Sequence, residues 1–396
     1  MRKTTLRVSH SALAALAALT VAGGCGKKNK DADKTSKTTT TTASAAVDAA
    51  VANTPVTTPP APPPKPAKLE GEALAKHFIE CHGYFSSQDK DKFKDCYAKD
   101  ATSHFADSMT PDSKGPDAIV AHAWDFHAAL PDGKTAPQLV LVNGRNVASV
   151  VLFTGTNTAE MKMGPQSMPA TGKKVGLQML HSVTFDDENR VTSEWWVVDD
   201  ATMGAQLGMP GAQGGRPVVE KGVDAPQIVV ATDSETEKAN LAAMQKSNEV
   251  FNAHDAKGSM DAWADDGIES DMASPADVQG KAEIEKGNKM FMTAFPDAKI
   301  DTRTAWAAGD YVFGVFTFNG TNKGKMGPMK ATNKPVTMGV AEIAKLEGGK
   351  VKQLWRFYNS YSMMAQLGMV PAAAQSAPAG AAAGSGSAAG SATKMN

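Results

Sequence analysis

Several signals that would assign a chemistry are missing from this chain. It has 396 residues, only three cysteines and a formal net charge of −1, so no strongly charged surface points to nucleic acid or to a cationic partner. The sequence has no phosphate-binding loop, zinc-ligand spacing or nucleophile elbow. We therefore expect no cofactor, no metal and no nucleic-acid partner, and hydrolytic or nucleotide-dependent chemistry has little support.

A long hydrophobic run is also missing, although the chain begins like an exported protein. Residues 1–25 have a basic start, a short Ala/Leu core and a run of small residues, which is typical of an export signal and too short to span a bilayer. Ala22-Gly23-Gly24-Cys25 resembles a bacterial lipobox, which predicts a lipid on Cys25 and attachment to a membrane. Gly26 favours the outer membrane, facing the periplasm or the cell surface. An ordinary cleaved signal with an incidental cysteine is the alternative.

The other two cysteines are candidates for a disulfide. If Cys25 carries lipid, Cys81 and Cys96 remain as a pair in an oxidising compartment. Both fall in predicted consecutive helices around a turn at residues 86–89, so a bridge would pin a helical hairpin. Two buried free thiols are the alternative.

Two stretches of the chain contain too few apolar residues to fold. Residues 26–68 are rich in Lys, Asp, Thr, Ala and Pro, which predicts a disordered tether. Residues 372–396 are rich in Ala, Gly and Ser, which predicts a disordered tail. The folded part is expected to lie between these two segments.

The central residues contain an internal duplication. The pentapeptide Ala-Gln-Leu-Gly-Met occurs at residues 205–209 and again at 365–369, and further matched pairs precede it in the same order. They include Leu130-Pro131-Asp132 with Phe295-Pro296-Asp297, Met163-Gly164-Pro165 with Met326-Gly327-Pro328, and Trp195 with Trp355. An offset of about 160 to 165 residues suits a duplicated domain. The predicted parts are a first domain at 69–210, a linker at 211–232 and a second domain at 233–371.

Each copy is expected to begin with helices and to end with long strands. Amphipathic helices are predicted at residues 72–86 and 235–253. The later strands are separated by Asn-Gly, Gly-Asp and Glu-Gly-Gly turns, which suit antiparallel hairpins. Helices followed by a meander of strands indicate the α+β class.

The ordered motifs resemble the SnoaL-like polyketide cyclase and ester cyclase group of the nuclear transport factor 2-like superfamily. They include Phe-Pro-Asp, Gly-Thr-Asn and the closing pattern W-x-x-x-D-x6-Q-L-G, which runs from Trp195 to Gly208. The resemblance extends over nearly all of both copies. It implies two tandem cone-shaped domains, each with a curved antiparallel sheet wrapped around about three helices and an apolar pocket between them.

The resemblance places acid–base chemistry on Asp199. It implies that this carboxylate removes a proton alpha to a carbonyl and that His104 is a further polar group of the pocket. Strand alternation turns His181 to the apolar side, where it can share or relay the proton. A satisfied core or rim histidine is the alternative. Strand alternation puts Asp199 on one face with Trp195. However, an Asp just before a helix that starts near Ala201 is also typical of a helix cap. Both interpretations remain open.

The second copy has Asn359 where the first has Asp199. An amide cannot act as a base, although it can cap a helix or bind a ligand, so any active site is expected in the first copy. The counterpart of His181 is predicted at Glu342. The residues expected to contact a small apolar ligand are Trp195, Met179, Trp355, Asn359 and Glu342.

Two functions are compatible with these patterns. The first is an exported, lipid-anchored module that binds a small apolar ligand, or whose domains pair with each other within or between chains. The second is a cofactor-independent ester cyclase, lyase or isomerase that uses Asp199 as general acid and base. Polyketide tailoring normally has intracellular substrates, so an exported location favours the non-catalytic function.

Overall fold

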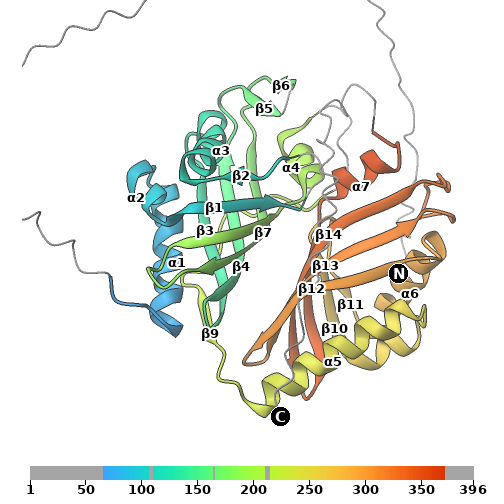
Figure 1. The fold of residues 1–396 in the computed structure, drawn as a ribbon. Helices are drawn as coiled ribbons and strands as arrows, with labels where there is room; N and C mark the ends of the chain where they lie inside the picture. The colour runs from blue at the N-terminus through green and yellow to red at the C-terminus, as the bar shows by residue number, and fades with distance from the viewer. Residues whose placement is uncertain (1–65, 107–109, 164–165, 210–214, 371–396) are drawn as a thin grey trace, which may run out of the picture. The chain divides into compact units, whose positions relative to one another are not determined.

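The computed structural model describes residues 66–106, 110–163, 166–209 and 215–370. The predicted lipidation site Cys25, the tether and the tail lie outside the described residues. The described residues belong to one compact unit, in which one α+β arrangement occurs twice (Figure 1). Within these ranges no helix is both long and apolar enough to cross a bilayer.

The first copy combines four helices with one long sheet. Its sheet has seven strands in the order β2-β1-β8-β7-β4-β3-β9, and a separate small hairpin is formed by β5 and β6. The helices are α1 (Gly71–Ser86), α2 (Lys90–Asp95), α3 (Pro116–Ala129) and α4 (Asp200–Leu207). The strands are β1 (Tyr97–Phe105), β2 (Ser113–Lys114), β3 (Lys134–Asn143), β4 (Asn146–Thr156), β5 (Met161–Met163), β6 (Gln166–Met168), β7 (Lys174–Phe185), β8 (Val191–Val197) and β9 (Gln227–Val230).

The second copy repeats this order, with a six-stranded sheet β11-β10-β15-β14-β13-β12. Where the first copy has α2, the second has a 3-10 turn, η1 (Gly258–Ala262). Its helices are α5 (Glu235–Asn252), α6 (Lys281–Ala294) and α7 (Ser360–Gln366). Its strands are β10 (Trp263–Asp271), β11 (Val278–Gln279), β12 (Lys299–Ala308), β13 (Tyr311–Thr321), β14 (Pro335–Glu347) and β15 (Lys350–Phe357). The predicted α+β class and tandem organisation are confirmed.

Local sequence signals explain where the first helix of each copy lies. On α1 the apolar residues Leu74, Phe78 and Phe85 recur on one helical face, and all three are buried in the core of the first copy. Helix α5 begins with a capping box, because Ser234 accepts a hydrogen bond from the amide of Glu237 and the Glu237 carboxylate accepts one from the amide of Ser234.

A disulfide joins the first two helices. Cys81 of α1 and Cys96, which directly follows α2, are bonded to each other, with 6.2 Å between their Cα atoms. Of the two alternatives left open by the sequence, the structure therefore has the bridge that pins the α1–α2 hairpin.

The repeated pentapeptide closes each copy with a short helix that is tied to the sheet. Gly208 and Gly368 follow α4 and α7 with φ of 73°, in the left-handed region that suits glycine after a helix. The Gln206 side chain accepts from the amide of Gly176 on β7 and donates to its carbonyl. The Gln366 side chain makes the same pair of hydrogen bonds with the backbone of Thr337 on β14. The duplication of the motif thus reflects the docking of one closing helix per copy.

The segment predicted as a linker contributes a strand to the first copy. β9 pairs in parallel with β3, and the side chains of Ile228 and Val230 pack against the core of the first copy. Residues 227–230 are therefore part of the first sheet and do not merely connect the two copies. The β-branched side chains at 228–230 fit a half-buried strand.

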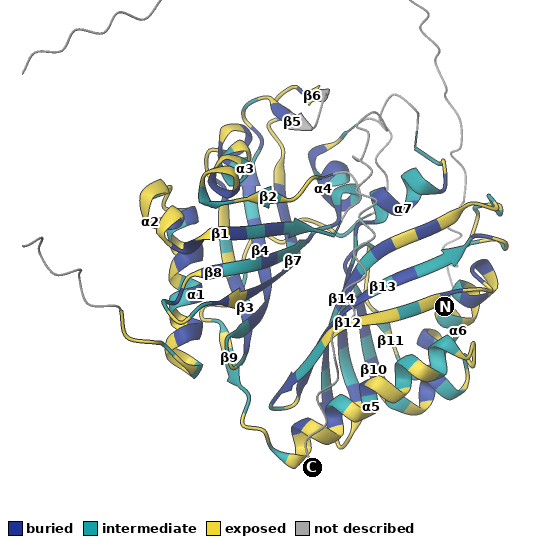
Figure 2. Ribbon diagram, viewed as in Figure 1, coloured by how far each residue is buried: buried dark blue, intermediate teal, exposed yellow. Residues whose placement is uncertain are grey.

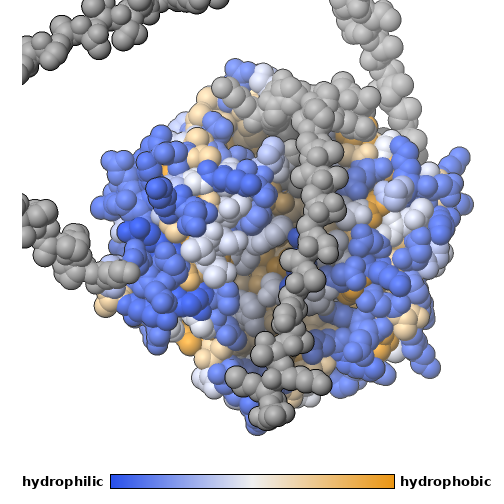
Figure 3. Space-filling view, in the orientation of Figure 1, coloured by the Kyte–Doolittle hydropathy of each residue, from blue (hydrophilic) through white to orange (hydrophobic). Residues whose placement is uncertain are grey.

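The two copies share a buried apolar cluster. The helices of each copy lie along one face of its own sheet (Figure 2). The other face contributes side chains to the shared cluster. On the face drawn in Figure 3, apolar side chains show in the recess between the copies, whereas the surface to either side is mainly hydrophilic. The shared cluster contains Leu139, Leu141, Ala148, Val150, Leu180 and Val197 from the first copy, and Met272, Ala308, Tyr311, Phe313, Val315, Ala341, Ile343 and Phe357 from the second.

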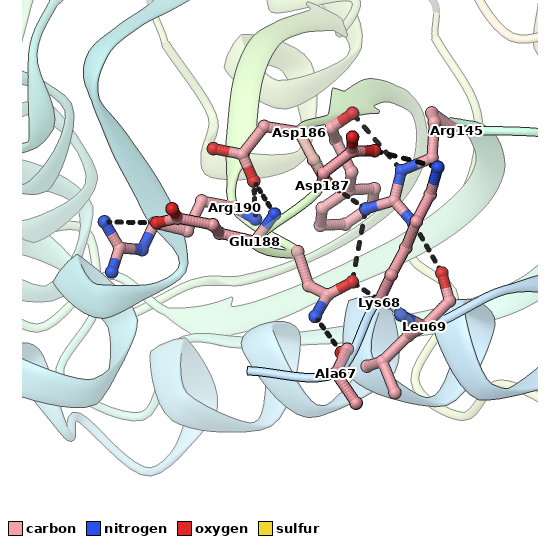
Figure 4. A network of polar contacts seen from close by, with 10 residues as sticks. Ala67, Lys68, Leu69, Arg145, Asp186, Asp187, Glu188 and Arg190 are labelled. Carbon is pink, nitrogen blue, oxygen red and sulfur yellow. Dashed lines mark hydrogen bonds and ion pairs between the residues drawn. The ribbon is translucent and has the colours of Figure 1, made fainter. Parts of the chain in front are cut away.

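A polar network fixes the segment before α1 (Figure 4). Arg145, in the β3–β4 turn, donates to the backbone carbonyls of Leu69 and Asp186. The Asn189 side chain accepts from the amide of Leu69 at 2.8 Å and donates to the carbonyl of Ala67 at 2.9 Å. The β3–β4 and β7–β8 turns therefore hold residues 67–69 in place before α1.

Candidate functional site

A line of buried polar side chains crosses the interior of the first copy. His82 lies on α1, His181 on β7 and Glu194 on β8, and they are 5%, 5% and 1% exposed. Nε2 of His82 lies 3.0 Å from Nδ1 of His181. Nε2 of His181 lies 2.9 Å from Oε2 of Glu194. Two histidines and a carboxylate are thus linked in one hydrogen-bonded line.

Two further side chains terminate this line. Thr135 Oγ1 lies 2.9 Å from Nδ1 of His82, and the hydroxyl of Tyr97 donates to Oε2 of Glu194 at 3.1 Å. The indole of Trp196 stacks on His181, with 3.6 Å between ring centroids and 9° between planes. We call the five linked residues the polar chain: Thr135, His82, His181, Glu194 and Tyr97.

The surroundings of the polar chain shift the pKa values of three of its members. Burial by itself would raise the pKa of Glu194, but hydrogen bonds from its neighbours, chiefly His181, outweigh burial and lower that pKa. Burial, with the charge of His181, holds the pKa of His82 well below its ordinary value. Burial, with the charge of Glu194, raises the pKa of Tyr97 well above its ordinary value. Near neutral pH, Glu194 is ionised, His82 is neutral and Tyr97 is a donor.

The polar chain is satisfied in two proton arrangements. In the first, Thr135 donates to Nδ1 of His82, Nε2–H of His82 donates to His181, and Nε2–H of His181 donates to Glu194. In the second, His181 is protonated and donates to both neighbours, His82 donates to Thr135, and the Thr135 hydroxyl turns to the His82 carbonyl at 3.4 Å. One proton can therefore be added without leaving a buried donor or acceptor unpaired.

The polar chain does not resemble a metal site. In both arrangements the two imidazoles use all four ring nitrogens in hydrogen bonds, so none is free for an ion. Across the described ranges no group of three or more His, Cys, Asp or Glu side chains could hold a metal ion.

The second copy builds the same fold without the polar chain. By strand register Glu342 stands at the position of His181, and Leu354 stands at the position of Glu194. Arg356 donates from Nε to Glu342 at 2.7 Å. The fold alone therefore does not require buried histidines, which makes the polar chain a candidate for function.

Asp199 lies away from the polar chain and is saturated by hydrogen bonds. It is 4% exposed, and it caps α4 by accepting from the amide and hydroxyl of Thr202 at 2.9 and 2.6 Å. Its other oxygen accepts from the amide and hydroxyl of Ser360, in the second copy, at 2.8 and 2.6 Å. Of the two interpretations of Asp199, the structure has the helix cap, and it does not bring Asp199 to His181.

Asn359 repeats this role in the second copy. It caps α7 by accepting from the amide of Ser362 at 3.0 Å, and its amide donates to Asp200 of the first copy at 2.7 Å. Because positions 199 and 200 match positions 359 and 360, the contacts are reciprocal, as in an interface around a twofold axis. Asp199 and Asn359 therefore hold equivalent places in a contact that joins the two copies.

This reciprocity predicts how substitutions at positions 199 and 360 change the stability of the protein. Asp199→Asn keeps a cap but turns a donor towards the amide of Ser360, so we expect a loss of about 1 to 3 kcal/mol of unfolding free energy. Adding Ser360→Asp recreates the amide–carboxylate pair of the other half and should recover most of the loss. Chemical denaturation of the single and double variants measures both. A double variant less stable than Asp199→Asn would contradict the reciprocal geometry.

The remaining predicted site residues do not gather in one place. Nδ1 of His104 lies 2.9 Å from Asp112, and the His104 ring stacks on Trp195 with 4.7 Å between centroids. Trp195 faces a cavity between the two copies, and Trp355 packs against the shared cluster. Met179 is buried in the core of the first copy. The predicted ligand-binding set is therefore spread over both faces of the sheets.

Sequence reasoning named only His181 among the five members of the polar chain, although signals for two of the other four were present. His82 follows Phe78 by four residues and precedes Phe85 by three, so helical spacing places it on the buried face of α1. Glu194 is in phase with Trp196 on β8, which marks a carboxylate on an apolar face. These two phase relations are the signals that could have found the polar chain.

The element order and the sheets define the class of each copy. Helices, a mostly antiparallel sheet and a closing helix form one α+β domain, which is present twice. The family model of the SnoaL-like polyketide cyclases matches residues 74–207 and 241–367. The chain therefore belongs to the SnoaL-like polyketide cyclase family and carries two copies of its domain.

Solved structures resemble one copy at a time. AclR of Streptomyces galilaeus is 22% identical, with 34% of this chain and 99% of that chain covered and a TM-score of 0.32. A SnoaL-like protein of Jannaschia sp. CCS1 is 16% identical, with 35% and 99% covered and a TM-score of 0.32. IdmH of Streptomyces antibioticus is 24% identical, with 34% and 99% covered and a TM-score of 0.31. No curated protein matches the chain.

Proposed function

We propose that this protein is a non-catalytic module that binds a small molecule and is exported and lipid-anchored through Cys25. The observation that carries the proposal is the saturation of its acid–base candidates. Both oxygens of Asp199 are occupied by Thr202 and Ser360. Both ring nitrogens of His181 are occupied by His82 and Glu194. A general base must present a free lone pair to its substrate, and neither group does so.

The disulfide supports the exported location. Bridges such as Cys81–Cys96 persist in oxidising compartments and are rare in the cytosol. A lipid on Cys25 would hold the protein at a membrane, and residues 26–68 would then separate the folded copies from its surface. Cys25→Ser is expected to release the protein from the membrane fraction of the producing cells. Continued sedimentation with membranes would contradict the lipid anchor.

Native mass spectrometry of the full chain purified in detergent tests the binding function. We expect a small organic molecule to be retained by the folded protein and released on unfolding. The variants Asp199→Asn and His181→Gln should retain it, because neither residue is proposed to act chemically on it. A protein that retains no molecule, and whose melting temperature responds to none in a broad panel of small organic compounds, would sink the binding function.

A second candidate function is proton transfer in the first copy. It is favoured by one observation, namely that the polar chain can accept a proton at His181 while every buried polar atom stays paired. The retained molecule would then exchange a hydrogen alpha to a carbonyl with deuterated solvent. His181→Gln should stop this exchange without releasing the molecule. Exchange at the same rate in that variant would exclude the polar chain as the path of the proton.

A further inference from the structure

A cavity of about 270 Å³ lies between the two copies, on the opposite side of the first sheet from the polar chain. On the side of the first copy it is lined by Asn146, Ser182 and Ser193. On the side of the second copy it is lined by Arg303, Trp306 and Phe313. Its walls thus combine hydroxyl and amide groups with aromatic rings and a single guanidinium.

The matching position across the pseudo-twofold relation is filled by side chains. By strand register Ser182 corresponds to Ile343, and Asn146 corresponds to Tyr311. Ile343 and Tyr311 are both buried in the shared cluster. The same interface can therefore close without a cavity. The small polar residues at 146 and 182 keep this one open.

Among the described residues, two hydroxyls of the cavity wall and the terminal nitrogens of one guanidinium lack protein partners, whereas Thr184 donates to the Asn146 side chain at 2.9 Å. In the described part of the chain the hydroxyls of Ser182 and Ser193 make no hydrogen bond, and no carboxylate lies within ion-pair distance of Arg303. Nε of Arg303 donates to Thr317 at 2.6 Å, and the guanidinium lies 5.5 Å from the ring centroid of Trp195. Arg303 is thus held in place, with its terminal nitrogens available.

We propose that this cavity binds a small planar organic carboxylate, an inference that rests on the proposed binding function and gives it a site. The terminal nitrogens of Arg303 match the two oxygens of a carboxylate. The rings of Trp306 and Phe313 suit a flat apolar body. The hydroxyls of Ser182 and Ser193 offer further hydrogen bonds. The volume is near the lower end of the range for ligand sites, so the ligand has one or two rings.

Titration of 2-naphthoate into the full chain in detergent tests the proposal, with 2-naphthamide as the uncharged match. We expect saturable binding of the acid and at least about tenfold weaker binding of the amide, because the charge-assisted bonds to Arg303 are lost. Arg303→Gln introduces the residue found at the equivalent position of the first copy, Gln138. This variant should bind 2-naphthoate more weakly by a similar factor. Lys299→Gln removes a charge from the same strand outside the cavity and should leave binding unchanged.

A second variant fills the cavity and leaves the charge in place. Ser182→Ile introduces the residue of the second copy, and we expect it to abolish naphthoate binding while the melting temperature stays equal or rises. Equal binding by the unmodified chain, Arg303→Gln and Ser182→Ile would overturn the proposal. So would no binding at all. If a molecule retained in native mass spectrometry survives Ser182→Ile, this site is wrong while the binding function stands. If no molecule is retained either, both are wrong.

Discussion

Replacing Glu194 with alanine is expected to lower the free energy of unfolding by about 3 kcal/mol or more. The carboxylate is 1% exposed and accepts from His181 and Tyr97. Its removal leaves both donors buried without a partner, and loss of one member of a buried charged network costs more than a surface ion pair. Chemical denaturation measures the loss. A cost below about 1 kcal/mol would mean that the polar chain relaxes or fills with water.

Acid titration separates the charge of Glu194 from its shape. The folded-state pKa of Glu194 is lowered from its ordinary value of 4.5, so its stabilising contribution is present above about pH 4.5 and is lost as the pH falls through the folded-state value. Glu194→Gln keeps the size and removes the charge. We expect that variant to be less stable at neutral pH and to lose less stability on acidification. Parallel pH profiles for the two proteins would contradict the assignment of an ionised Glu194.

The second large effect is expected from the disulfide. The bridge joins residues 15 apart, and closing a loop of that length stabilises a fold by about 3 kcal/mol in the chain-entropy model. The variant with Cys81→Ala and Cys96→Ala should therefore melt several degrees lower than the unmodified chain. Thermal unfolding followed by circular dichroism measures this shift.

A reductant supplies the control for the disulfide prediction. Dithiothreitol should lower the melting temperature of the unmodified chain towards that of the double variant, and it should leave the double variant unchanged. If the reductant destabilises both proteins equally, it acts elsewhere. If it affects neither, the bridge does not contribute to stability.

The sequence predicted the positions of the helices better than it predicted which face of each sheet holds a candidate site. Helix α1 was expected at residues 72–86 and occupies Gly71–Ser86. The helix expected at 235–253 occupies Glu235–Asn252. Periodicity, caps and turn residues are local, so one chain segment contains the information that places each of them.

The face of the sheet that holds a site could not be predicted in this way. Alternation places Trp195 on one face of β8, but both faces of the first sheet are apolar. One face packs against the helices of the first copy, and the other packs against the second copy. The polar chain also joins distant positions, since His82 and His181 are 99 residues apart. No local pattern encodes that pairing. The spacing of the two histidines becomes meaningful only once α1 packs against β7.

The strand β9 changes where the first copy can be separated from the second. It pairs with the outer edge of β3 along residues 139–142. The last strand of the second sheet, β12, has no such cover among the described residues and instead exposes Lys299, Asp301 and Arg303, charges that discourage pairing with another chain. A first copy cut after α4 would therefore present an uncharged, apolar sheet edge and tend to aggregate. A separated first copy should therefore extend to residue 231, so that it keeps β9.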